Sequence, residues 1–413
     1  MAALLGDAYQ RKLTSLDVNS PRYVVELVDL LLNEARMVNA SDVHLLPTSD
    51  GLESWWRVDG VLQLAGKVPP SFAPNVISRL KVLSELVTYR SDLPQEGRVR
   101  GEPGDIEMRV STFPTVFGEK AVIRLFAGVG HYTRLHELGL PDEIRLSLTR
   151  LLAETSGAIL LAGPAGSGKS TTIYACLREL ISFSSGGRSV VTMEDPIEVL
   201  VPGAAQSQVN LAAGFDLATG LRSLMRQDPE VIAVGEIRDR ITAEIAFQAS
   251  LTGHLLLSTF HAGSAAGVVS RLSEMGIEPY VLRSGLRAIV CQRLVRRLCD
   301  ACARETHDPS HFLGMPIEHA RIAVGCPFCR GTGYRGRVVL AELLVPDDFE
   351  VSWAILSRTD LEQLETSAIK SGMVSRWERA RNAVEAGLTD PSEVRRVLGF
   401  SDRWASAEIH QTV

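Results

Sequence analysis

The first third of the chain changes from a helical to a strand-like pattern of hydrophobic residues. In YVVELVDLLLNEARM the apolar residues recur at helical spacing, which predicts a helix with one buried face. ASDVHLLP and LESWWRVDGVLQL then alternate as strands do, with a turn at Asp59-Gly60, and a second helix is expected at about 75–90. DIEMRVSTFPTVFGEKAVIRLF predicts two more strands. Together these elements predict a small α+β domain over 21–126, after a flexible polar segment over 1–20.

Four short and almost uniformly apolar runs lie in the middle of the chain: AILLAG, SVVTME, VIAVGE and HLLLSTF. Each has the length of a strand, and helix-compatible sequence separates it from the next. Such runs are typical of parallel strands covered by helices on both faces, so they predict a doubly wound α/β domain. We place this domain at 139–290, after a glycine-containing linker at 127–138. A segment rich in cysteine and glycine follows at 291–340, and a helical segment at 341–413.

Composition narrows the class of protein. The chain has 413 residues, of which 45% are hydrophobic and 22% charged, which is ordinary for a globular protein of several domains. The formal net charge of -6 argues against a protein that wraps nucleic acid, since such chains are usually basic. The first residues have no secretory signal pattern, and no apolar run reaches membrane-spanning length. We therefore expect a cytoplasmic protein whose membrane role, if it has one, is peripheral.

The sequence GPAGSGKST follows the first apolar run and precedes a predicted helix. It fits the phosphate-loop pattern G-x-x-x-x-G-K-[ST], in which glycines let backbone N–H groups close around phosphates. Lys169 would neutralise the terminal phosphates, Ser170 would bind Mg²⁺, and the helix dipole adds to the attraction. The alternative is a glycine-rich turn that fits by chance, and the strand-loop-helix context argues against it. The predicted nucleotide-binding residues are Gly163, Pro164, Ala165, Gly166, Ser167, Gly168, Lys169, Ser170, Thr171 and Thr172.

Acidic residues end two of the later apolar runs. Glu194 ends SVVTME and Glu236 ends VIAVGE, where Gly235 stands at the position that an aspartate often occupies. Carboxyl ends of strands meet at the ligand-binding edge of an open α/β sheet, so one acid can hold Mg²⁺ and the other can polarise water. His254 and His261 flank the run LLLSTF. A single acid at a strand end is often a cap or turn residue, but two of them after a phosphate loop favour catalysis.

Four of the six cysteines form two C-x2-C pairs. Two such pairs can close a tetrahedral thiolate site, which suits structural zinc, and unligated buried thiols are the alternative. The four predicted ligands are Cys299, Cys302, Cys326 and Cys329. Three histidines between the pairs could replace a thiolate: His307, His311 and His319. Cys176 and Cys291 are expected to be packing residues.

Several motifs in order resemble the secretion ATPases of type II secretion and type IV pilus assembly. They are GPAGSGKSTTIYACL, MEDPIE, LRSLMRQDPEVIAVGEIRD, LTGHLLLSTFHAG and QRLVRRLCDAC, and the resemblance spans about residues 20–400. In that family the second acidic motif has the form G-E-I-R-D, as it has here. The resemblance implies an α/β, RecA-like ATPase core with a smaller PAS-like α+β domain, a tetracysteine metal loop and a helical C-terminal part.

The resemblance also implies roles for individual residues. Glu194 would be the general base, and Glu236 would bind magnesium through water or share the base role. His261, with His254 as a second candidate, would sense the γ-phosphate. The family works as homohexameric rings in which the small domain supplies arginines to the neighbouring subunit, and a solvated strand face is the alternative for these arginines. The matching residues are Arg98, Arg109 and Arg124.

Two departures from the family pattern bear on these expectations. Many members read LHTN where this chain has FHAG, so Ala262 and Gly263 lack two polar side chains. Larger members carry a further N-terminal domain that docks to an inner-membrane partner, and we expect that module to be missing here because only 1–20 precede the first predicted helix.

The sequence therefore predicts a cytoplasmic hexameric ATPase that uses ATP, Mg²⁺ and Zn²⁺ to power pseudopilus assembly in type II secretion. Its expected partners are copies of itself and inner-membrane platform proteins, with no nucleic acid. A pilus assembly or DNA-uptake ATPase is the near alternative, because the motifs do not separate these systems. A nucleic-acid motor and a zinc-stabilised scaffold that only binds ATP are the more distant ones.

Overall fold

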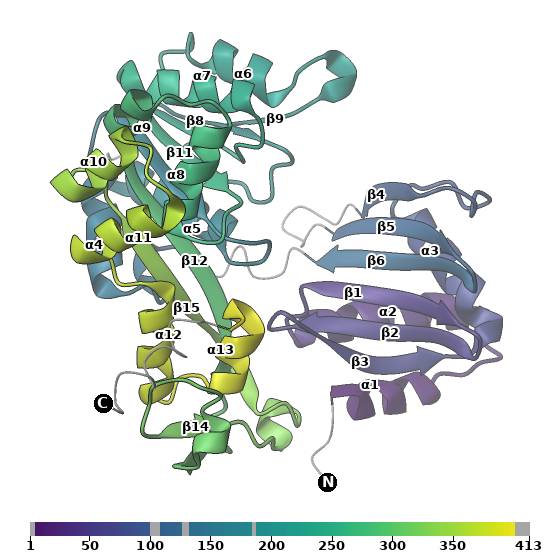
Figure 1. Ribbon diagram of the computed structural model, residues 1–413. Coiled ribbons are helices and arrows are strands. Elements are labelled where there is room, and N and C mark those ends of the chain that lie inside the picture. The colour runs from purple at the N-terminus through teal and green to yellow at the C-terminus, as the bar shows by residue number, and fades with distance from the viewer. Residues whose placement is uncertain (1–4, 100–107, 126–131, 184–186, 401–413) are drawn as a thin grey trace. The chain divides into compact units, whose positions relative to one another are not determined.

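The computed structural model describes residues 5–99, 108–125, 132–183 and 187–400, which form two compact units (Figure 1). The first unit comprises Met1–Gly128, Arg296–Thr306 and Arg321–Arg337. The second comprises Val129–Val295, His307–Ala320 and Val338–Val413. Among the described residues, no helix is long and apolar enough to cross a membrane.

The first unit is built on a six-stranded antiparallel sheet with the order β3-β2-β1-β6-β5-β4. Its alternating residues place apolar side chains on one face, where three helices cover them and form a single core. The strands are β1 (Asp42–Thr48), β2 (Gly51–Val58), β3 (Val61–Val68), β4 (Gln95–Val99), β5 (Met108–Thr115) and β6 (Gly118–Leu125). The helices are α1 (Leu5–Thr14), α2 (Tyr23–Met37) and α3 (Ala73–Leu83), with a 3-10 turn at η1 (Pro70–Phe72).

The start of the chain differs from the flexible segment that the sequence predicts over 1–20. Residues 5–14 form helix α1, whose Tyr9 and Leu13 are buried in the core of the first unit. The Tyr9 ring lies 4.8 Å from the ring of Trp56 on β2. Two apolar residues four positions apart are too short a pattern to reveal an amphipathic helix, so only tertiary packing identifies it.

The second unit contains a seven-stranded sheet with the order β15-β12-β7-β11-β10-β8-β9. The four apolar runs of the sequence are β7, β8, β10 and β11, and their pairings are parallel, which confirms the predicted α/β fold. β11 and β12 lie on either side of β7, so the strand order reverses at β7. The strands are β7 (Gly157–Ala162), β8 (Val190–Glu194), β9 (Ala205–Gln208), β10 (Val231–Val234), β11 (Leu255–Phe260), β12 (Leu286–Leu298) and β15 (Tyr334–Leu344).

Helices cover both faces of this sheet (Figure 1). Alternate residues of β7 point to opposite faces: Leu160 joins the core with α7 and α8, and Leu161 joins the core with α4 and α5. The helices are α4 (Asp142–Leu151), α5 (Lys169–Phe183), α6 (Leu217–Leu224), α7 (Arg240–Leu251), α8 (Ala265–Glu274), α9 (Pro279–Gly285), α10 (Phe349–Leu356), α11 (Leu361–Lys370), α12 (Arg376–Glu385) and α13 (Pro391–Leu398). Short elements complete the chain: η2 (Leu135–Glu137), η3 (Leu211–Ala213), η4 (Pro309–His311), η5 (Pro327–Cys329), and the paired strands β13 (Arg304–Thr306) and β14 (Ala320–Ile322).

The C-terminal part is more closely integrated than the predicted helical segment at 341–413. Helices α10 and α11 contribute Val351, Ile355 and Leu364 to the same core as α7 and α8. Strand β12 pairs with β7 and extends the central sheet into the cysteine-rich segment. Sequence patterns could not reveal this, because the strand QRLVRRL carries polar residues where the earlier strands are apolar.

Candidate nucleotide and metal sites

The phosphate loop connects the carboxyl end of β7 to the first turn of α5. Pro164, Ala165 and Gly166 are exposed at its tip, whereas Ser167 and Lys169 are buried. The Lys169 ammonium donates hydrogen bonds to the carbonyl oxygens of Gly163 at 2.8 Å and Pro164 at 3.0 Å. Burial lowers the pKa of Lys169, and the Glu236 carboxylate opposes that shift. The charge that would meet the phosphates is therefore held inside the loop.

Two glycines of the loop have backbone conformations in which any other residue would be strained. Gly163 has a φ of 143°, and a Cβ there would lie 2.5 Å from the carbonyl oxygen of Gln292. Gly168 has a φ of 91°, and a Cβ there would lie 3.0 Å from the side-chain nitrogen of the same glutamine. The glycines that the pattern demands thus let β12 approach the loop closely.

Glu194 lies at the carboxyl end of β8 and is buried. Its Oε1 accepts hydrogen bonds from Thr192 Oγ1 at 2.6 Å and Gln206 Nε2 at 3.0 Å. Its Oε2 accepts one from the Tyr174 hydroxyl at 2.5 Å. Burial raises the pKa of Tyr174 and the Glu194 carboxylate raises it further, so this tyrosine remains a donor at neutral pH. Three donors therefore fix the orientation of the Glu194 carboxylate.

Glu236 follows β10 and faces the loop that follows β11. Its Oε1 lies 3.0 Å from His261 Nε2, and its Oε2 accepts a hydrogen bond from Arg238 Nε at 2.8 Å. The charge of the Glu236 carboxylate also raises the pKa of Lys169, against the effect of burial. The backbone N–H of Gly235 donates to Met193 O at 2.8 Å, which ties this strand end to the β8 end that carries Glu194. Lys169, Glu194, Glu236 and His261 therefore all lie at the carboxyl edge of the sheet.

His254 does not belong to this group. It precedes β11, whereas His261 follows it, so the two histidines lie at opposite edges of the sheet. The Nδ1 atom of His254 lies 3.0 Å from Ala249 O at the end of α7, and its backbone carbonyl accepts from Gly157 at the start of β7. The suggestion that His254 senses phosphate is therefore wrong, because a six-residue strand separates it from the site by roughly 20 Å.

The three candidate arginines lie side by side on the face of the first unit's sheet opposite its helices. Directly opposed residues of five strands form one row across this face, in the order Arg57, Asp42, Arg124, Arg109 and Arg98. Asp42 pairs with Arg124 at 3.1 Å and with Arg57 at 3.3 Å, and Arg109 pairs with Glu96. The Arg124 side chain remains 63% exposed, so it is able to meet an anionic group from another molecule.

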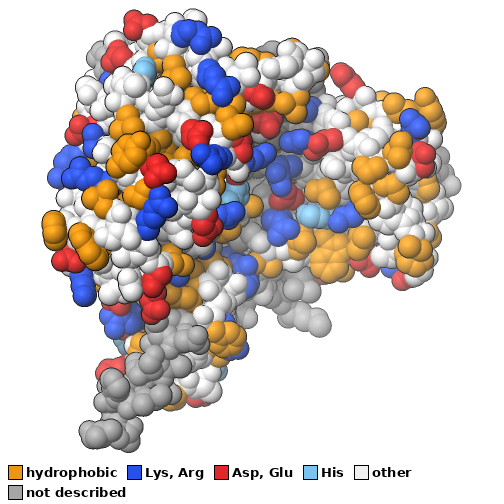
Figure 2. All heavy atoms as spheres, turned by 45° about the horizontal axis from the view of Figure 1, so that its top comes forward, with side chains coloured by type: hydrophobic (Ala, Val, Ile, Leu, Met, Phe, Trp, Pro, Cys, Tyr) orange, Lys and Arg blue, Asp and Glu red, His pale blue; other side chains and the backbone are white. Residues whose placement is uncertain are grey.

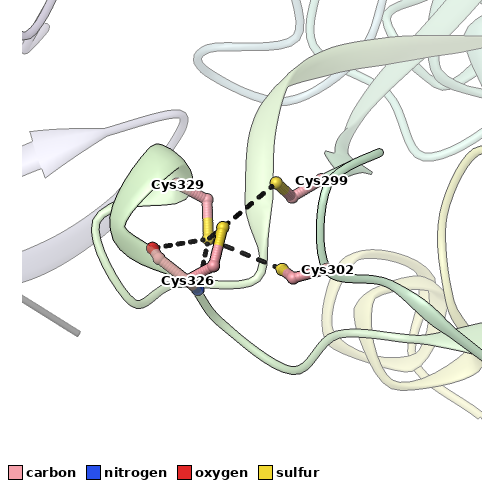
Figure 3. A group of neighbouring side chains, drawn as sticks. All are labelled: Cys299, Cys302, Cys326 and Cys329. Carbon is pink, nitrogen blue, oxygen red and sulfur yellow. Dashed lines mark hydrogen bonds between the residues drawn. The ribbon is translucent and has the colours of Figure 1, made fainter. Parts of the chain in front are cut away.

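The four cysteines of the two C-x2-C pairs come together in the first unit (Figure 3). Their sulfur atoms all lie within 4.8 Å of one another, and three of the separations are 3.9, 3.8 and 3.7 Å. A tetrahedral zinc thiolate with bonds of about 2.3 Å requires sulfur separations of roughly 3.8 Å. The cluster therefore has the dimensions of a zinc site.

Backbone groups around the cluster suit thiolates. Cys329 Sγ accepts hydrogen bonds from the backbone N–H groups of Cys326 at 3.1 Å and Gly333 at 3.2 Å. Although burial raises the pKa of Cys329, these bonds and those from neighbouring thiols lower it to about 6. His307, His311 and His319 are not members of the cluster. Cys176 and Cys291 are buried in the two cores of the second unit, as packing residues are.

The structure adds two residues that sequence reasoning missed. Tyr174 on α5 binds Glu194, and Gln292 on β12 donates to the Ser167 carbonyl at 2.8 Å. Tyr174 stands one helical turn after the phosphate loop, and this spacing was the one available signal. Gln292 is brought to the loop only because β12 pairs with β7, which no motif in the sequence indicates.

Comparison with known proteins gives the family. Residues 17–396 match the family described as "Type II/IV secretion system protein". The chain belongs to this family. It is 41% identical to the type II secretion system protein E of Pectobacterium carotovorum subsp. carotovorum over 389 residues, which cover 92% of this chain and 77% of that protein. It is 36% identical to the type IV pilus assembly ATPase PilB of Thermus thermophilus, over 94% of this chain and 45% of that protein.

Solved structures support the same fold. The X-ray structure of the Legionella pneumophila ATPase DotB superposes with a TM-score of 0.66 over 96% of this chain and 99% of that one, at 22% identity. At this identity the likeness concerns the fold. The family, the ATPase name of the pilus assembly relative and the intact phosphate loop support ATPase activity for this chain.

Proposed function

We propose that this chain is a homohexameric ATPase that powers pseudopilus assembly in type II protein secretion. The carrying observation is the extent of the likeness to a type II secretion system protein E, at 41% identity over 92% of the chain and 77% of the relative. The likeness to the pilus assembly ATPase is lower, at 36%, and covers 45% of that protein. This difference favours secretion over pilus assembly.

The nucleotide would bind at the carboxyl edge of the seven-stranded sheet. Backbone N–H groups of 163–172 would surround its phosphates, and Lys169 would exchange its loop carbonyls for phosphate oxygens. Ser170, in the first turn of α5, would bind Mg²⁺, with Glu236 as a ligand through water. This arrangement needs no aspartate at the position of Gly235.

Water activation falls to the two glutamates. We assign the general base to Glu194, because three hydrogen-bond donors fix its carboxylate. Glu236, paired with His261 at 3.0 Å, would connect the metal to the residue that senses the γ-phosphate. Both side chains would then act on one phosphoryl group from neighbouring strand ends.

The arginine row of the first unit would complete the site in the ring. We propose that Arg98, Arg109 and Arg124 of one subunit act on the nucleotide that the neighbouring subunit binds. The planar guanidinium spreads its charge over the transferred phosphoryl oxygens, so it suits this task better than lysine. ATP binding would then bring the domains together, and hydrolysis would let them separate.

Zinc would occupy the tetracysteine cluster, since the sulfur separations match a tetrahedral thiolate site. Its role would be structural, because four protein ligands leave no open position for a substrate. The expected partners are further copies of the chain and inner-membrane platform proteins, which would hold it at the cytoplasmic side of the membrane.

The test is a host strain that carries Lys169→Ala at the native locus. We expect secreted enzymes to accumulate inside the cell while surface pili and DNA uptake persist. Normal secretion with loss of pili or uptake would reject the secretion assignment in favour of the pilus system. The purified variant should also lose ATP hydrolysis. Its melting temperature should equal that of the wild type, which would show that the loss of activity does not come from an unstable protein.

A nucleic-acid motor is the rival from another class. A continuous basic surface is the usual footprint of nucleic-acid binding. On the face in view in Figure 2, basic, acidic and apolar side chains are interspersed, and the whole chain has a net charge of -6. Stimulation of ATP hydrolysis by single- or double-stranded DNA would favour this rival.

A further inference from the structure

Two adjacent residues of β12 lie beside the nucleotide site. Cys291 pairs with Ala162, the last residue of β7, so Gln292 and Arg293 stand next to the start of the phosphate loop. Neighbouring side chains on a strand point to opposite faces of the sheet. Gln292 consequently faces the α5 side, and Arg293 faces the α8 side.

Gln292 holds the phosphate loop at two points. Its side-chain nitrogen donates to the Ser167 carbonyl at 2.8 Å, and its side-chain oxygen accepts from the Thr172 hydroxyl at 3.1 Å. The residue is 2% exposed, so these bonds do not compete with water. The two contacts lie on either side of Lys169 and therefore fix the segment that would surround the phosphates.

Arg293 holds a different segment, the loop that carries His261. Its Nη2 donates to the carbonyl oxygen of Gly263 at 2.9 Å, and Arg271 of α8 donates to the carbonyl oxygen of His261 at 3.2 Å. Ala262 and Gly263 have no polar side chains of their own. The loop is thus held through its backbone by arginines, in place of the polar side chains that it lacks.

We propose that Gln292 and Arg293 are positioning residues for ATP hydrolysis, Gln292 for the phosphate loop and Arg293 for the loop of His261. The inference rests on the proposed ATPase activity of this site. Because the two residues act on different segments, they predict different kinetic effects. A disordered phosphate loop weakens binding of ATP, whereas a displaced His261 slows the chemical step after binding.

The first experiment compares Gln292→Leu with the wild type. We expect the KM for ATP to rise about tenfold, because the Ser167 carbonyl and the Thr172 hydroxyl lose a buried partner, with kcat changed less than about threefold. The matched control is Arg287→Met, which removes a bond from the same strand to a carbonyl, Ser156 O at 3.3 Å, at the opposite edge of the sheet. The control should keep both constants.

The second experiment is a double-mutant cycle of Arg293→Met and His261→Ala. We expect Arg293→Met to lower kcat by about tenfold with little change in KM, since a small displacement of a reacting group has effects of that order. The double variant should be no slower than His261→Ala alone, because Arg293 acts through His261. Additive losses in the cycle would overturn this role and would mean that Arg293 contacts the nucleotide itself.

Binding of a fluorescent ATP analogue distinguishes a failure of the proposed ATPase function from a failure of the role proposed for Gln292. If the wild type binds the analogue without hydrolysing ATP, the proposed function fails, and Gln292→Leu must still weaken binding about tenfold. An unchanged dissociation constant in Gln292→Leu, with a melting temperature equal to that of the wild type, would overturn the role of Gln292. An equal loss of analogue affinity in the Arg287→Met control would also overturn the role of Gln292, because it would indicate a general loss of stability.

Discussion

At the scale of single residues, the candidate nucleotide site contains side chains whose orientation is fixed by hydrogen bonds from neighbouring side chains. Glu194 is the clearest case, since Thr192, Gln206 and Tyr174 occupy both of its oxygens. A general base held in this way, which is the role proposed for Glu194, reacts without first having to find its orientation, and this is one source of catalytic rate. The neighbours of Glu194 should therefore matter for catalysis although they need not touch the nucleotide.

Tyr174→Phe tests this arrangement. We expect kcat to fall about tenfold with little change in the KM for ATP, because one Glu194 oxygen loses its donor while the phosphate loop is untouched. Steady-state ATPase kinetics measure both constants. The control is Tyr9→Phe, which removes the hydroxyl of a buried tyrosine in the other unit and should leave kcat and KM unchanged. An equal fall in kcat in both variants would contradict the proposal that Tyr174 orients Glu194 for catalysis.

The two buried thiols outside the cysteine cluster predict a loss of stability at alkaline pH. Burial raises the pKa of Cys176 and Cys291 from 9.0 to about 12. Because the folded-state pKa is raised, the stabilisation is complete below pH 9 and is lost as the pH rises toward 12. At pH 10 each thiol should reduce the free energy of unfolding by an amount on the order of 1 kcal/mol relative to neutral pH. Urea denaturation at pH 7 and pH 10 measures it, and Cys176→Ala should show a shallower decline.

At the scale of elements, helix α1 shows how tertiary contacts stabilise a short helix. Ten residues of mostly polar sequence form a helix because Tyr9 and Leu13 reach the core of the first unit. An isolated helix of this length is marginal in water, so its stability comes from packing. Its removal should therefore weaken the whole first unit and not only the start of the chain.

Tyr9→Ala should lower the free energy of unfolding by about 3–5 kcal/mol, the cost of deleting a buried aromatic ring. The contact with Trp56 at 4.8 Å also places a fluorophore at the site. The midpoint of urea denaturation, followed by tryptophan fluorescence, gives the measurement. Tyr9→Phe keeps the ring and should stay within about 1 kcal/mol of the wild type. If Tyr9→Ala lowered the free energy of unfolding no more than Tyr9→Phe does, the packing of α1 would not stabilise the first unit.

The cysteine cluster, formed by the segment between β12 and β15, predicts that the protein contains zinc. We expect about one zinc ion per chain by elemental analysis, and its loss in Cys326→Ser, because three thiolates bind zinc less tightly than four. Metal removal by a chelator should lower the melting temperature of the wild type. Cys176→Ala, outside the cluster, should retain its metal. Full zinc content in Cys326→Ser would show that another residue completes the site.

At the scale of the whole molecule, the nucleotide site and the arginine row belong to different units. Row and phosphate loop are each preformed, with the row fixed by strand register and the loop by β7, α5 and β12. Such a division suits a ring in which each subunit completes the site of its neighbour. In the proposed ring, the assembly and not the single chain would then be the active unit.

Subunit mixing tests this directly. Lys169→Ala and Arg109→Ala should each abolish most ATP hydrolysis, and a mixture of the two should regain part of it. Activity returns because an intact phosphate loop of one subunit then meets an intact arginine from the other. Mixtures of Lys169→Ala with Lys169→Ala/Arg109→Ala are the control and should stay inactive. Failure of the first mixture, with mixed rings confirmed by mass, would place the arginines outside the neighbour's site.

Much of the fold and part of the site follow from sequence pattern alone. The uniformly apolar runs determine the parallel strands, since only strands buried on both faces tolerate such composition. The glycines and Lys169 of the phosphate loop and the paired cysteines are local motifs, in which the chemistry depends on residues close in sequence. Helix α1 and the role of β12 did not follow, because their signals are short or mixed with polar residues.

The sequence by itself therefore determined the family, the phosphate loop, the two acids at strand ends and the four cysteines of the cluster. Only the tertiary structure decided that His254 lies at the wrong edge of the sheet, that Arg98, Arg109 and Arg124 share one row, and that Tyr174 holds Glu194. The physical reason is that strand order and register bring together residues far apart along the chain. Such proximity depends on the packing of the whole unit, whereas a motif depends on the chain's own local geometry.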